Sequence, residues 1–440
     1  MKITIIGTGY VGLVTGTCLA SMGNDVICVD HDEGKINELI QGGMPIYEPG
    51  LKELIERNRN EGRLEFSTDI KTSIQDSLVV FICVQTPPLP DGGADLTYIE
   101  KVSREIAENL NGYKVIVEKS TVPVKTCEWV FKTIKESLKS SCSFDVASNP
   151  EFLCEGSAVK DFLNPDRIII GVESEKAKKI LTDLYSPFQK KIFTTDIRSA
   201  EMIKHASNSF LATKISFANA LANICELSGA DVKEVVQGMG FDPRIGTKFF
   251  GVGIGYGGEC FPKDVAAFRR IAKDLGYDFG LLSEVEKINK NQRTMFCKKI
   301  EDALGDLNGK KIGIWGLAYK PNTDDMRNAP SIDVIKFLLK RGARIKAYDP
   351  EAIEKARSIF PDLTYVHNPY EAARDCDVLV ILTEWPEFKG LDLHRIKREL
   401  KNPLVIDGRN IYEPFQMEEH QLQYISIGRK TNFEKMKVRL

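Results

Sequence analysis

Short β-branched runs alternate with helical patterns through the first half of the chain. We expect strands at 2–6, 25–30, 78–84, 114–119, 144–148, 167–172 and 191–194. Strands that alternate with helical segments are typical of parallel sheets with helices on both faces. The first half of the chain therefore predicts an α/β architecture.

A long helical pattern replaces this alternation from about Ser199 to Leu227. Apolar residues recur in it at helical spacing, at Met202, Ile203, Ala206, Phe210, Ile215, Phe217 and Leu221. A helix of this length could join two domains or pair with a second subunit. A glycine-rich stretch follows at 246–258, and further helix is expected to about Leu304.

The second half begins a new α/β pattern at Lys310 that repeats the plan of the first. The strand-like segments 3–7, 26–30 and 79–84 have counterparts at 311–316, 345–349 and 378–382. The sequence therefore predicts an α/β fold with two Rossmann-like doubly wound domains joined by a long central helix.

Composition and charge narrow the class of protein. The 440 residues exceed what one ordinary core holds, and 28% charged residues is typical of a soluble globular chain. With 60 basic and 62 acidic residues, the net charge of -2 gives no electrostatic reason to expect a nucleic acid or a membrane as partner. No apolar run reaches transmembrane length. The basic tail at 429–440 is expected to be a solvated end.

The cysteines and the start of the chain indicate a reducing compartment. The ten cysteines are scattered without a C-x-x-C pair or a cluster with histidine, so we expect neither a disulfide framework nor a bound metal. The chain enters a strand-like run at Lys2 and shows no signal-peptide pattern. These features together predict a cytoplasmic protein.

A glycine motif lies between the first strand and the first helix. Gly7 permits a tight turn, Gly9 lets the backbone approach a pyrophosphate, and Gly12 allows close packing of helix and strand. Tyr10 and Val11 begin the helix, whose positive end favours phosphate groups. The position of the motif predicts a dinucleotide-binding site.

The end of the second strand indicates which dinucleotide binds. Asp30 stands there, at the spacing expected for a carboxylate that binds ribose hydroxyls. His31 and Asp32 follow, so no arginine is present to bind a 2′-phosphate, and NAD is favoured over NADP. Lys35 could also reach the cofactor.

The segment 255–264 carries the most informative chemistry in the chain. Pro262 suits the first position of a helix, which places Cys260 just before a helix N-terminus and beside Lys263. Both features favour the thiolate and hence a nucleophile. Asp264 lies four residues after Cys260 and can share its face of the first turn. Nearby glycines are expected to leave backbone amides bare for an anionic or sugar ligand, at positions 251, 253, 255, 257 and 258.

These motifs together resemble those of the UDP-glucose/GDP-mannose dehydrogenase family, over nearly the whole chain. Besides the cysteine turn, the resemblance rests on Pro45 to Leu51, Lys119 to Pro123, Asn149 to Gly156, Lys204 with Asn208, Asp242 to Gly246 and Gly316 to Arg327. Two positions depart from the family's pattern. Glu259 replaces a common Ser or Ala, which would alter the sugar pocket, and Gln85 replaces a common Gly, which would alter the nicotinamide side.

The resemblance implies an NAD-dependent four-electron oxidation of a nucleotide sugar, UDP-glucose to UDP-glucuronate, that serves polysaccharide biosynthesis. An aldehyde is a poor hydride donor until a nucleophile adds to it, and Cys260 can supply that nucleophile through a thiohemiacetal and a thioester. Three domains are expected: an NAD-binding domain at 1–198, a helical dimerisation and catalytic-cysteine region at 199–305, and a UDP-sugar-binding domain at 306–440.

The resemblance also implies catalytic roles. Lys204 and Asn208 lie four residues apart on the long helix, share one face, and would act at the reacting oxygen. Asp264 would orient these groups or carry a proton. The remaining catalytic candidates, which would lie near the nicotinamide and the attacking water, are Thr121, Glu151 and Glu155.

Binding residues follow from the same resemblance. The substrate would contact Glu151, Phe152, Leu153, Lys204, Asn208, Phe249, Phe250, Gly251, Val252, Gly253, Gly257 and Lys320. Arg244 would reach the substrate of a neighbouring subunit, which implies a homodimer. Besides the glycine motif, Asp30 and Lys35, NAD would contact Thr86, Thr121, Glu155, Lys263 and Arg327.

Three other functions remain open at this point. A sister enzyme that acts on GDP-mannose or a UDP-N-acetylhexosamine would share the cysteine turn. A two-electron hydroxyacid dehydrogenase would release one NADH per substrate and would not need Cys260. A non-catalytic NAD-sensing module would bind NAD without turnover, and the intact cysteine turn argues against it.

Overall fold

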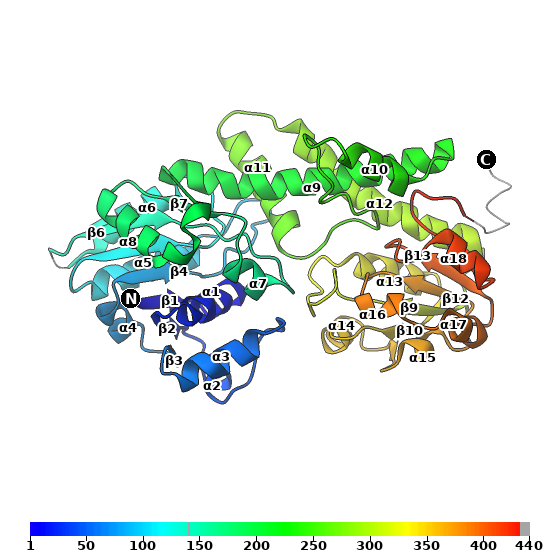
Figure 1. Ribbon diagram of the computed structural model, residues 1–440, viewed down its shortest axis with the longest axis horizontal. Helices are drawn as coiled ribbons and strands as arrows, with labels where there is room; N and C mark the ends of the chain where they lie inside the picture. The colour runs from blue at the N-terminus through cyan, green and yellow to red at the C-terminus, as the bar shows by residue number, and fades with distance from the viewer. Residues whose placement is uncertain (140, 432–440) are drawn as a thin grey trace. The chain divides into compact units, whose positions relative to one another are not determined.

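The computed structural model describes all residues except 140 and 432–440. Two compact units make up the chain: Met1–Ser207 with Ala266–Asp278, and Asn208–Val265 with Phe279–Leu440. Each unit is built around one sheet (Figure 1). The part of the expected solvated tail beyond Thr431 lies outside the described residues.

The sheet of the first unit has eight strands in the order β3-β2-β1-β4-β5-β6-β7-β8. They are β1 Lys2–Ile6, β2 Asp25–Val29, β3 Leu64–Ser67, β4 Val79–Ile82, β5 Lys114–Glu118, β6 Phe144–Ser148, β7 Ile168–Gly171 and β8 Ile192–Thr195. The seven strands expected here are confirmed. The sheet is parallel except between β6 and β7, which are antiparallel. The predicted α/β architecture is confirmed, and the antiparallel pair is a detail that the sequence pattern does not indicate.

Strand β3 at the sheet edge is one that the sequence pattern does not predict. Its four residues carry a charged, exposed Glu65 between the buried Leu64 and Phe66. Two apolar positions are too few to stand out as a periodic pattern. Strand β4 at the centre is the opposite case, because all four of its residues are buried and apolar.

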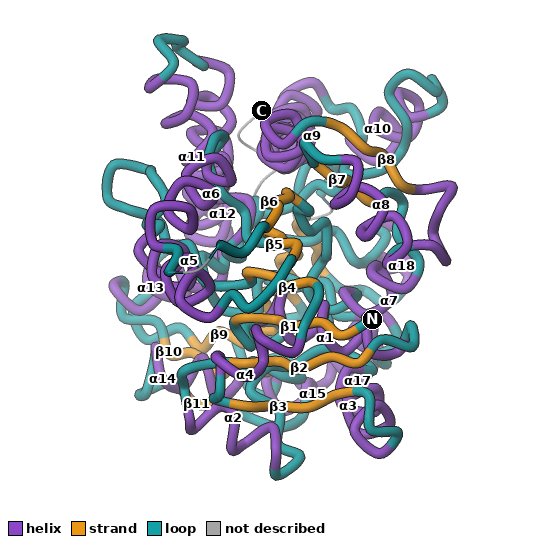
Figure 2. Tube along the Cα trace, turned by 90° about the vertical axis from the view of Figure 1, so that its left-hand side faces the viewer, coloured by secondary structure: helices purple, strands orange, loops and turns teal. Residues whose placement is uncertain are grey.

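Helices cover both faces of the first sheet, with α5 and α6 on one face and α1 and α7 on the other (Figure 2). The helices of this unit are α1 Tyr10–Ser21, α2 Glu33–Ile40, α3 Leu51–Asn60, α4 Ile70–Asp76, α5 Thr97–Asn109, α6 Thr126–Ser137, α7 Ala158–Leu163 and α8 Glu175–Leu184, with the 3-10 helix η1 Ser186–Lys191. Successive residues of β4 point into the two cores, since Phe81 packs with α1 and Ile82 with α5.

The sheet of the second unit has six strands, all parallel, in the order β11-β10-β9-β12-β13-β14. They are β9 Lys311–Trp315, β10 Arg344–Tyr348, β11 Thr364–Tyr365, β12 Val378–Ile381, β13 Leu404–Asp407 and β14 Gln423–Ile425. The helices are α10 Val232–Gly240, α12 Gly280–Leu304, α13 Pro330–Lys340, α14 Ile353–Ile359, α15 Pro369–Ala373, α16 Pro386–Lys389, α17 Leu393–Glu399 and α18 Pro414–Glu419. The strand order repeats that of β1 to β6, which confirms the doubly wound plan expected for both halves.

The turn after the first strand is also alike in the two sheets. Gly7 has a φ of 100° and Gly316 a φ of 88°. The Gly7 amide donates to the Val29 carbonyl at 2.8 Å, and the Gly316 amide donates to the Tyr348 carbonyl at 2.9 Å. A left-handed conformation at this turn favours glycine in both places.

The aspartate that ends the second strand differs between the sheets. Asp349 is completely buried, and one of its carboxylate oxygens accepts hydrogen bonds from the amides of Leu317 and Ala318 at 2.7 and 3.1 Å. The same oxygen accepts a third bond of 3.1 Å from the indole of Trp385. The counterpart Asp30 instead lines a pocket, as described below.

Two helices contribute to both units: α9 Ile197–Ser228 and α11 Cys260–Asp274. Helix α9 confirms the long helix expected at 199–227. The three expected domains stay a prediction, since the two compact units divide α9 after Ser207. Among the residues described, no helix is both long and apolar enough to cross a membrane.

The first half of α9 buries a different face from the one that the apolar pattern indicates. Ala206 and Phe210, which belong to that pattern, are exposed. Polar side chains are buried in their place: Glu201, Lys204, His205, Asn208 and Ser209. Apolar periodicity identifies a helix, but polar residues with hydrogen-bonding partners can occupy its buried face.

Candidate active site

The turn between β1 and α1 forms one wall of a pocket in the first unit. A Cβ on Gly7 would lie 2.6 Å from the carbonyl oxygen of Cys83, and a Cβ on Gly12 would lie 1.9 Å from the carbonyl oxygen of Gly7. A Cβ on Gly9 would meet no other described part of the chain within 4 Å. Packing therefore requires the first and third glycines, whereas Gly9 leaves the start of α1 accessible to a pyrophosphate.

The pocket has a volume of about 240 Å³ and contains four predicted cofactor residues: Gly7, Gly9, Asp30 and Lys35. The Asp30 carboxylate accepts hydrogen bonds from the amide and the hydroxyl of Thr8 at 2.8 and 2.9 Å. Burial raises the pKa of Asp30, but these bonds, the Asp32 amide and the Lys35 ammonium lower it to a net value below its usual one. The carboxylate is therefore ionised at neutral pH and can accept hydrogen bonds from ribose hydroxyls, so the residues fit NAD.

Tyr10 and Val11 lie in the first turn of α1, and Tyr10 is bound within the chain. Its hydroxyl donates to the buried carboxylate of Glu48, which also accepts hydrogen bonds from the amides of Gly156 and Ala158 at 2.6 and 2.7 Å. Glu48 therefore caps α7 and fixes the loop before it. Sequence reasoning missed this role, although the segment around Glu48 was part of the resemblance.

Lys204 on α9 and Glu151 after β6 form a buried ion pair, with 2.8 Å between Nζ and Oε1. The other oxygen of Glu151 accepts a 2.6 Å hydrogen bond from the Leu153 amide. The Lys204 ammonium also lies 5.4 Å from the centre of the Phe152 ring. Burial raises the pKa of Glu151, but Lys204 and the Leu153 amide lower it to a net value below its usual one. The structure thus brings four predicted substrate residues together, with the carboxylate ionised.

A buried lysine beside this pair was not predicted. Lys119 donates hydrogen bonds of 3.0 Å to both the backbone and the side-chain oxygen of Asn149, and Tyr185 donates to the same side chain at 2.7 Å. Burial lowers the pKa of Lys119 to about 8. These contacts join the loop after β5 to the loop that carries Glu151. The available signal was a lysine directly after a wholly buried strand.

The residues predicted for the nicotinamide side lie in neighbouring loops of the first unit. Thr86 donates a 3.1 Å hydrogen bond to the Thr121 carbonyl, and Ser120 donates a 2.9 Å bond to the Val84 carbonyl. Glu155 is half-buried in the loop before α7. These loops follow the adjacent strands β4, β5 and β6, where a doubly wound sheet binds its ligands.

In the second unit, α11 begins at Cys260, whose side chain is exposed. The expected boundary is corrected slightly, because Cys260 is the first residue of the helix and Pro262 the third. Proline is tolerated throughout the first turn, where amides have no partner within the helix. The thiol still lies at the positive end of the helix, with Lys263 in the same turn, which favours the thiolate.

Asp264 is buried one turn after the cysteine. One of its carboxylate oxygens accepts a 2.6 Å hydrogen bond from the Asn208 amide group on α9. The other oxygen is buried and has no hydrogen-bond partner in the described part of the chain. Since such an atom is costly to leave unpaired, it is suited to bind a water or a substrate hydroxyl. Two residues predicted from separate motifs are therefore in direct contact.

The glycine-rich loop before α11 is packed rather than open. The Gly253 amide donates to a side chain of α9 at 2.9 Å, and the Gly258 amide donates to the Arg327 carbonyl at 2.8 Å. The expectation of bare amides is wrong for these two residues. The glycines allow other segments to approach closely, since a Cβ on Gly257 would lie 2.5 Å from a backbone oxygen. Gly251 is open, because a Cβ there would meet no atom of the described residues within 4 Å.

Three other residues of this loop were predicted to bind substrate. Phe249 is partly exposed and has a φ of 65°, a left-handed conformation that costs a non-glycine residue about 1–2 kcal/mol. Phe250 is buried, with the Lys214 ammonium 4.2 Å from its ring centre. Val252 is half-buried against the core of the second unit. The loop conformation is therefore held by its surroundings.

Arg327 follows the segment after β9 and lies between two acids. Its guanidinium forms ion pairs with Asp325 at 2.8 Å and with Glu259. Glu259 is the position that departs from the family's pattern. In this chain, Glu259 pairs with Arg327, which was predicted to contact NAD.

The two remaining predicted cations are less constrained. Lys320 is half-buried, with its ammonium 5.6 Å from the centre of the Tyr319 ring. Arg244 is largely exposed and pairs at 2.5 Å with Asp242, two residues earlier. Their predicted contacts with substrate stay predictions. No cluster of His, Cys, Asp and Glu that could hold a metal ion occurs in the described residues.

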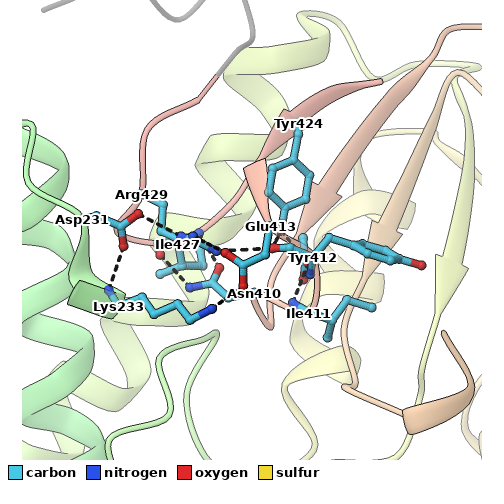
Figure 3. A network of polar contacts seen from close by, with 10 residues as sticks. Asp231, Lys233, Asn410, Ile411, Tyr412, Glu413, Tyr424, Ile427 and Arg429 are labelled. Carbon is cyan, nitrogen blue, oxygen red and sulfur yellow. Dashed lines mark hydrogen bonds and ion pairs between the residues drawn. The ribbon is translucent and has the colours of Figure 1, made fainter. Parts of the chain in front are cut away.

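The start of the basic tail is not a solvated end. The Arg429 side chain is buried and pairs with Asp231 at 3.2 Å and with Glu413 at 2.7 Å (Figure 3). Lys233 pairs with the same Glu413 (Figure 3). The expectation is wrong at Arg429 because the N-cap residue of α10 and the loop before α18 supply two carboxylates. Asp231 is far from Arg429 in the sequence, so no sequence pattern indicates this contact.

Comparison with family models covers most of the chain. The NAD binding domain of the UDP-glucose/GDP-mannose dehydrogenase family matches residues 1–189, its central domain matches 198–291, and its UDP binding domain matches 313–414. The pocket that contains Asp30 lies in the first of these regions and Cys260 in the second.

Individual relatives match over nearly their full length. UDP-glucose 6-dehydrogenase TuaD of Bacillus subtilis strain 168 is 50% identical, over 97% of this chain and 93% of the relative. A UDP-glucose dehydrogenase structure from Pyrobaculum islandicum has a TM-score of 0.91 at 38% identity, covering 97% of this chain and 98% of that one. A UDP-D-ManNAc dehydrogenase structure from Pyrococcus horikoshii has a TM-score of 0.84 at 30% identity, covering 98% and 99%. The chain belongs to the UDP-glucose/GDP-mannose dehydrogenase family.

Proposed function

We propose that this protein oxidises UDP-glucose to UDP-glucuronate with two NAD, by covalent catalysis at Cys260. The observation that carries the proposal is the exposed thiol at the start of α11, one turn from the buried pair of Asn208 and Asp264. A simple alcohol dehydrogenation needs no thiol. The choice of UDP-glucose is supported by the 50% identity to UDP-glucose 6-dehydrogenase TuaD.

NAD supplies the hydride acceptor for both oxidations. In the first oxidation, the primary alcohol loses a hydride and a proton and becomes an aldehyde. The Cys260 thiolate adds to the aldehyde carbon, and the resulting alkoxide takes up a proton to give a thiohemiacetal. Loss of a second hydride and a proton gives a thioester, which water cleaves to the acid and the free thiol. The sum consumes one UDP-glucose, two NAD and one water, and releases UDP-glucuronic acid, two NADH and two protons.

The buried polar groups suit the charges that this sequence creates. The Lys204 ammonium, held at 2.8 Å by Glu151, stabilises negative charge on the reacting oxygen. The free carboxylate oxygen of Asp264 accepts a proton or positions water, and Asn208 fixes its orientation. We assign Thr121 and Glu155 to the nicotinamide side, with Glu155 as a candidate base for the attacking water.

The yield of NADH tests this proposal. Limiting UDP-glucose should give close to two NADH per sugar, because both hydrides leave the same carbon. A yield near one, with free aldehyde or ketone as the product, would contradict it. The same assay with GDP-mannose and UDP-N-acetylhexosamines tests the identity of the sugar, since a UDP-D-ManNAc dehydrogenase has the same fold.

We further propose that the protein is a homodimer that pairs through α9. Phe210, Phe217 and Ile224 are 66%, 51% and 60% exposed, and they recur every seventh residue on one face of the helix. A row of large exposed apolar side chains is typical of an interface. Phe217→Asp should therefore give a monomer in light scattering. An unchanged molar mass for that variant, or a monomeric parent, would contradict the dimer.

We place the enzyme in the cytoplasm. None of the cysteines in the described residues forms a disulfide, and the proposed chemistry needs Cys260 as a thiolate. A reducing compartment keeps thiols in that state. Cell fractionation followed by the NADH assay would test the location.

A further inference from the structure

The buried face of α9 carries two polar residues that the proposed reaction does not use. Glu201 and His205 are 2% and 1% exposed. They lie three residues before Lys204 and one residue after it, on the same face of the helix. Burying a carboxylate and an imidazole is unfavourable unless both are hydrogen-bonded. Both have partners in residues 120–127, which we call the Thr121 loop.

Glu201 binds the end of the Thr121 loop. Its two carboxylate oxygens accept hydrogen bonds from the amides of Lys125 at 2.7 Å and Cys127 at 2.8 Å. Lys125 is the N-cap residue of α6, with a φ of 79° and no cap from its own side chain. Glu201 therefore provides the cap of α6 from another helix. Burial raises the pKa of Glu201, and the hydrogen bonds from the two amides offset this only in part. The ionised form of Glu201 is therefore less favourable in the folded protein than in water.

His205 binds the middle of the Thr121 loop. Its Nε2 lies 2.7 Å from the carbonyl oxygen of Val122, the residue after Thr121. A carbonyl oxygen only accepts, so Nε2 carries the hydrogen and His205 is the donor. The imidazole also stacks on Phe268, with 6.0 Å between ring centres. The ring is thus fixed in orientation by one hydrogen bond and one aromatic contact.

The Thr121 loop is therefore held at Thr121 and at three residues after it. Thr86 binds the Thr121 carbonyl at 3.1 Å, and α9 binds the following residues through Glu201 and His205. The same face of α9 carries Lys204, which is paired with Glu151. One rigid helix thus fixes both the loop and the ammonium.

We propose that Glu201 and His205 are positioning residues that hold Thr121 at a fixed distance from the Lys204 ammonium during hydride transfer. This inference rests on the proposed function, in which Thr121 lies beside the nicotinamide. The two residues act through the Thr121 loop. A misplacement of about 1 Å at a reacting centre can lower a rate by about 10²-fold, so loosening the loop should affect the chemical steps more than binding.

The test compares four variants in steady-state NADH formation with UDP-glucose and NAD. Glu201→Gln retains the shape of the side chain but replaces one acceptor oxygen by an NH₂ group, so one of the two backbone amides loses its acceptor. His205→Phe keeps the stacking on Phe268 and loses the donor, whereas His205→Gln restores a donor at a similar reach. Glu128→Gln is the matched control, because Glu128 also joins α6 to α9, through Arg198 on the exposed surface.

We expect kcat to fall about 10- to 100-fold in Glu201→Gln and His205→Phe, with KM for both substrates within about threefold of the parent. His205→Gln should recover most of kcat, and Glu128→Gln should leave it unchanged. In hydrogen exchange, the amides of Lys125 and Cys127 should exchange faster in Glu201→Gln. If one of the two variants does not fold, the other decides the outcome.

Three results would overturn the inference. The first is a kcat within about threefold of the parent in folded Glu201→Gln and His205→Phe. The second is an equal fall of kcat in His205→Gln and His205→Phe. The third is an effect on KM with kcat unchanged. Failure of the proposed function would look different. The parent itself would then give one NADH per sugar, and the ratio of variant to parent rates would still report on the loop.

Discussion

The Lys204 ammonium and the Glu151 carboxylate lie 2.8 Å apart, and both side chains are almost completely buried. The two residues are separated by 53 positions in the sequence and come from a helix and a loop. Removing one member of a buried pair leaves an uncompensated charge, which typically costs about 3–5 kcal/mol. Apolar residues could fill the same space without an ion that can lose its partner, so stability alone does not explain the pair. The catalytic role that we propose for Lys204 does give a reason for it.

Replacing Cys260 by Ser should lower formation of the acid by at least about 10³-fold, or about 4 kcal/mol of transition-state stabilisation. A serine hydroxyl has a far higher pKa than a thiol and leaves less readily at the hydrolysis step. Binding of NAD and UDP-glucose, measured by calorimetry, should be almost unchanged. Cys154→Ser is the matched control, since Cys154 is also exposed, and it should remain active. If Cys260→Ser made UDP-glucuronate within about tenfold of the parent rate, covalent catalysis would have to be abandoned.

Replacing Asp30 by Ala should narrow the preference for NAD over NADP in kcat/KM. We expect the ionised carboxylate to accept hydrogen bonds from ribose hydroxyls and to repel a 2′-phosphate, so its loss should act mainly by weakening NAD binding. Asp25→Ala, at the exposed opposite end of β2, should change neither cofactor. Equal use of both cofactors by the parent would show that the role given to Asp30 is wrong.

Replacing Lys119 by Met should change how stability depends on pH. Burial lowers the pKa of Lys119 to about 8 in the folded protein, against 10.5 for an ordinary lysine. Between these values the unfolded chain binds a proton that the folded protein has released, so the contribution of Lys119 to the free energy of unfolding rises with pH. The parent should therefore gain stability relative to Lys119→Met in urea unfolding from about pH 7.5 to about pH 9.5. A difference that is constant over this range would rule out the lowered pKa.

Replacing Arg429 by Met should lower the free energy of unfolding by about 1–3 kcal/mol, because Asp231 and Glu413 lose a buried partner. Arg104→Met provides the comparison, since Arg104 pairs with Glu100 on the exposed surface of α5. An exposed pair of that kind contributes about 0–1 kcal/mol. Equal effects of the two substitutions in urea unfolding would mean that Arg429 is solvated after all.

The sequence predicts those elements whose signal is local. Strand β4 is apolar at every position because it is buried on both faces, so its residues alone identify it. The face of α9 is different, because Glu201 is buried by partners 74 and 76 positions away. The sequence of the helix alone carries no sign of those partners, because they lie in another segment. The helix can therefore be predicted from the sequence, and its buried face cannot.

The candidate site divides in the same way. Gly7, Asp30 and Cys260 stand in motifs whose spacing predicts their roles. Gly7 and Asp30 line the pocket as predicted, and Cys260 lies at the start of α11, one residue from the predicted boundary. The contact of Asn208 with Asp264 joins two such motifs, and only the fold shows it. Lys119 has no local sign beyond a charge after an apolar strand, because its role depends on Asn149 in the next loop.

The aspartate of the second sheet has a consequence for the order of events in a catalytic cycle. Asp349 is completely buried and bound to the Trp385 indole, so it cannot accept hydrogen bonds from a ribose in the way that we propose for Asp30. We expect both hydride acceptors to use the site at Asp30, one after the other. The first NADH must then depart and a fresh NAD must enter while the half-oxidised sugar stays on the enzyme. A bond to Cys260 would keep the sugar from diffusing away during that exchange, so that the nucleophile would also serve as a tether.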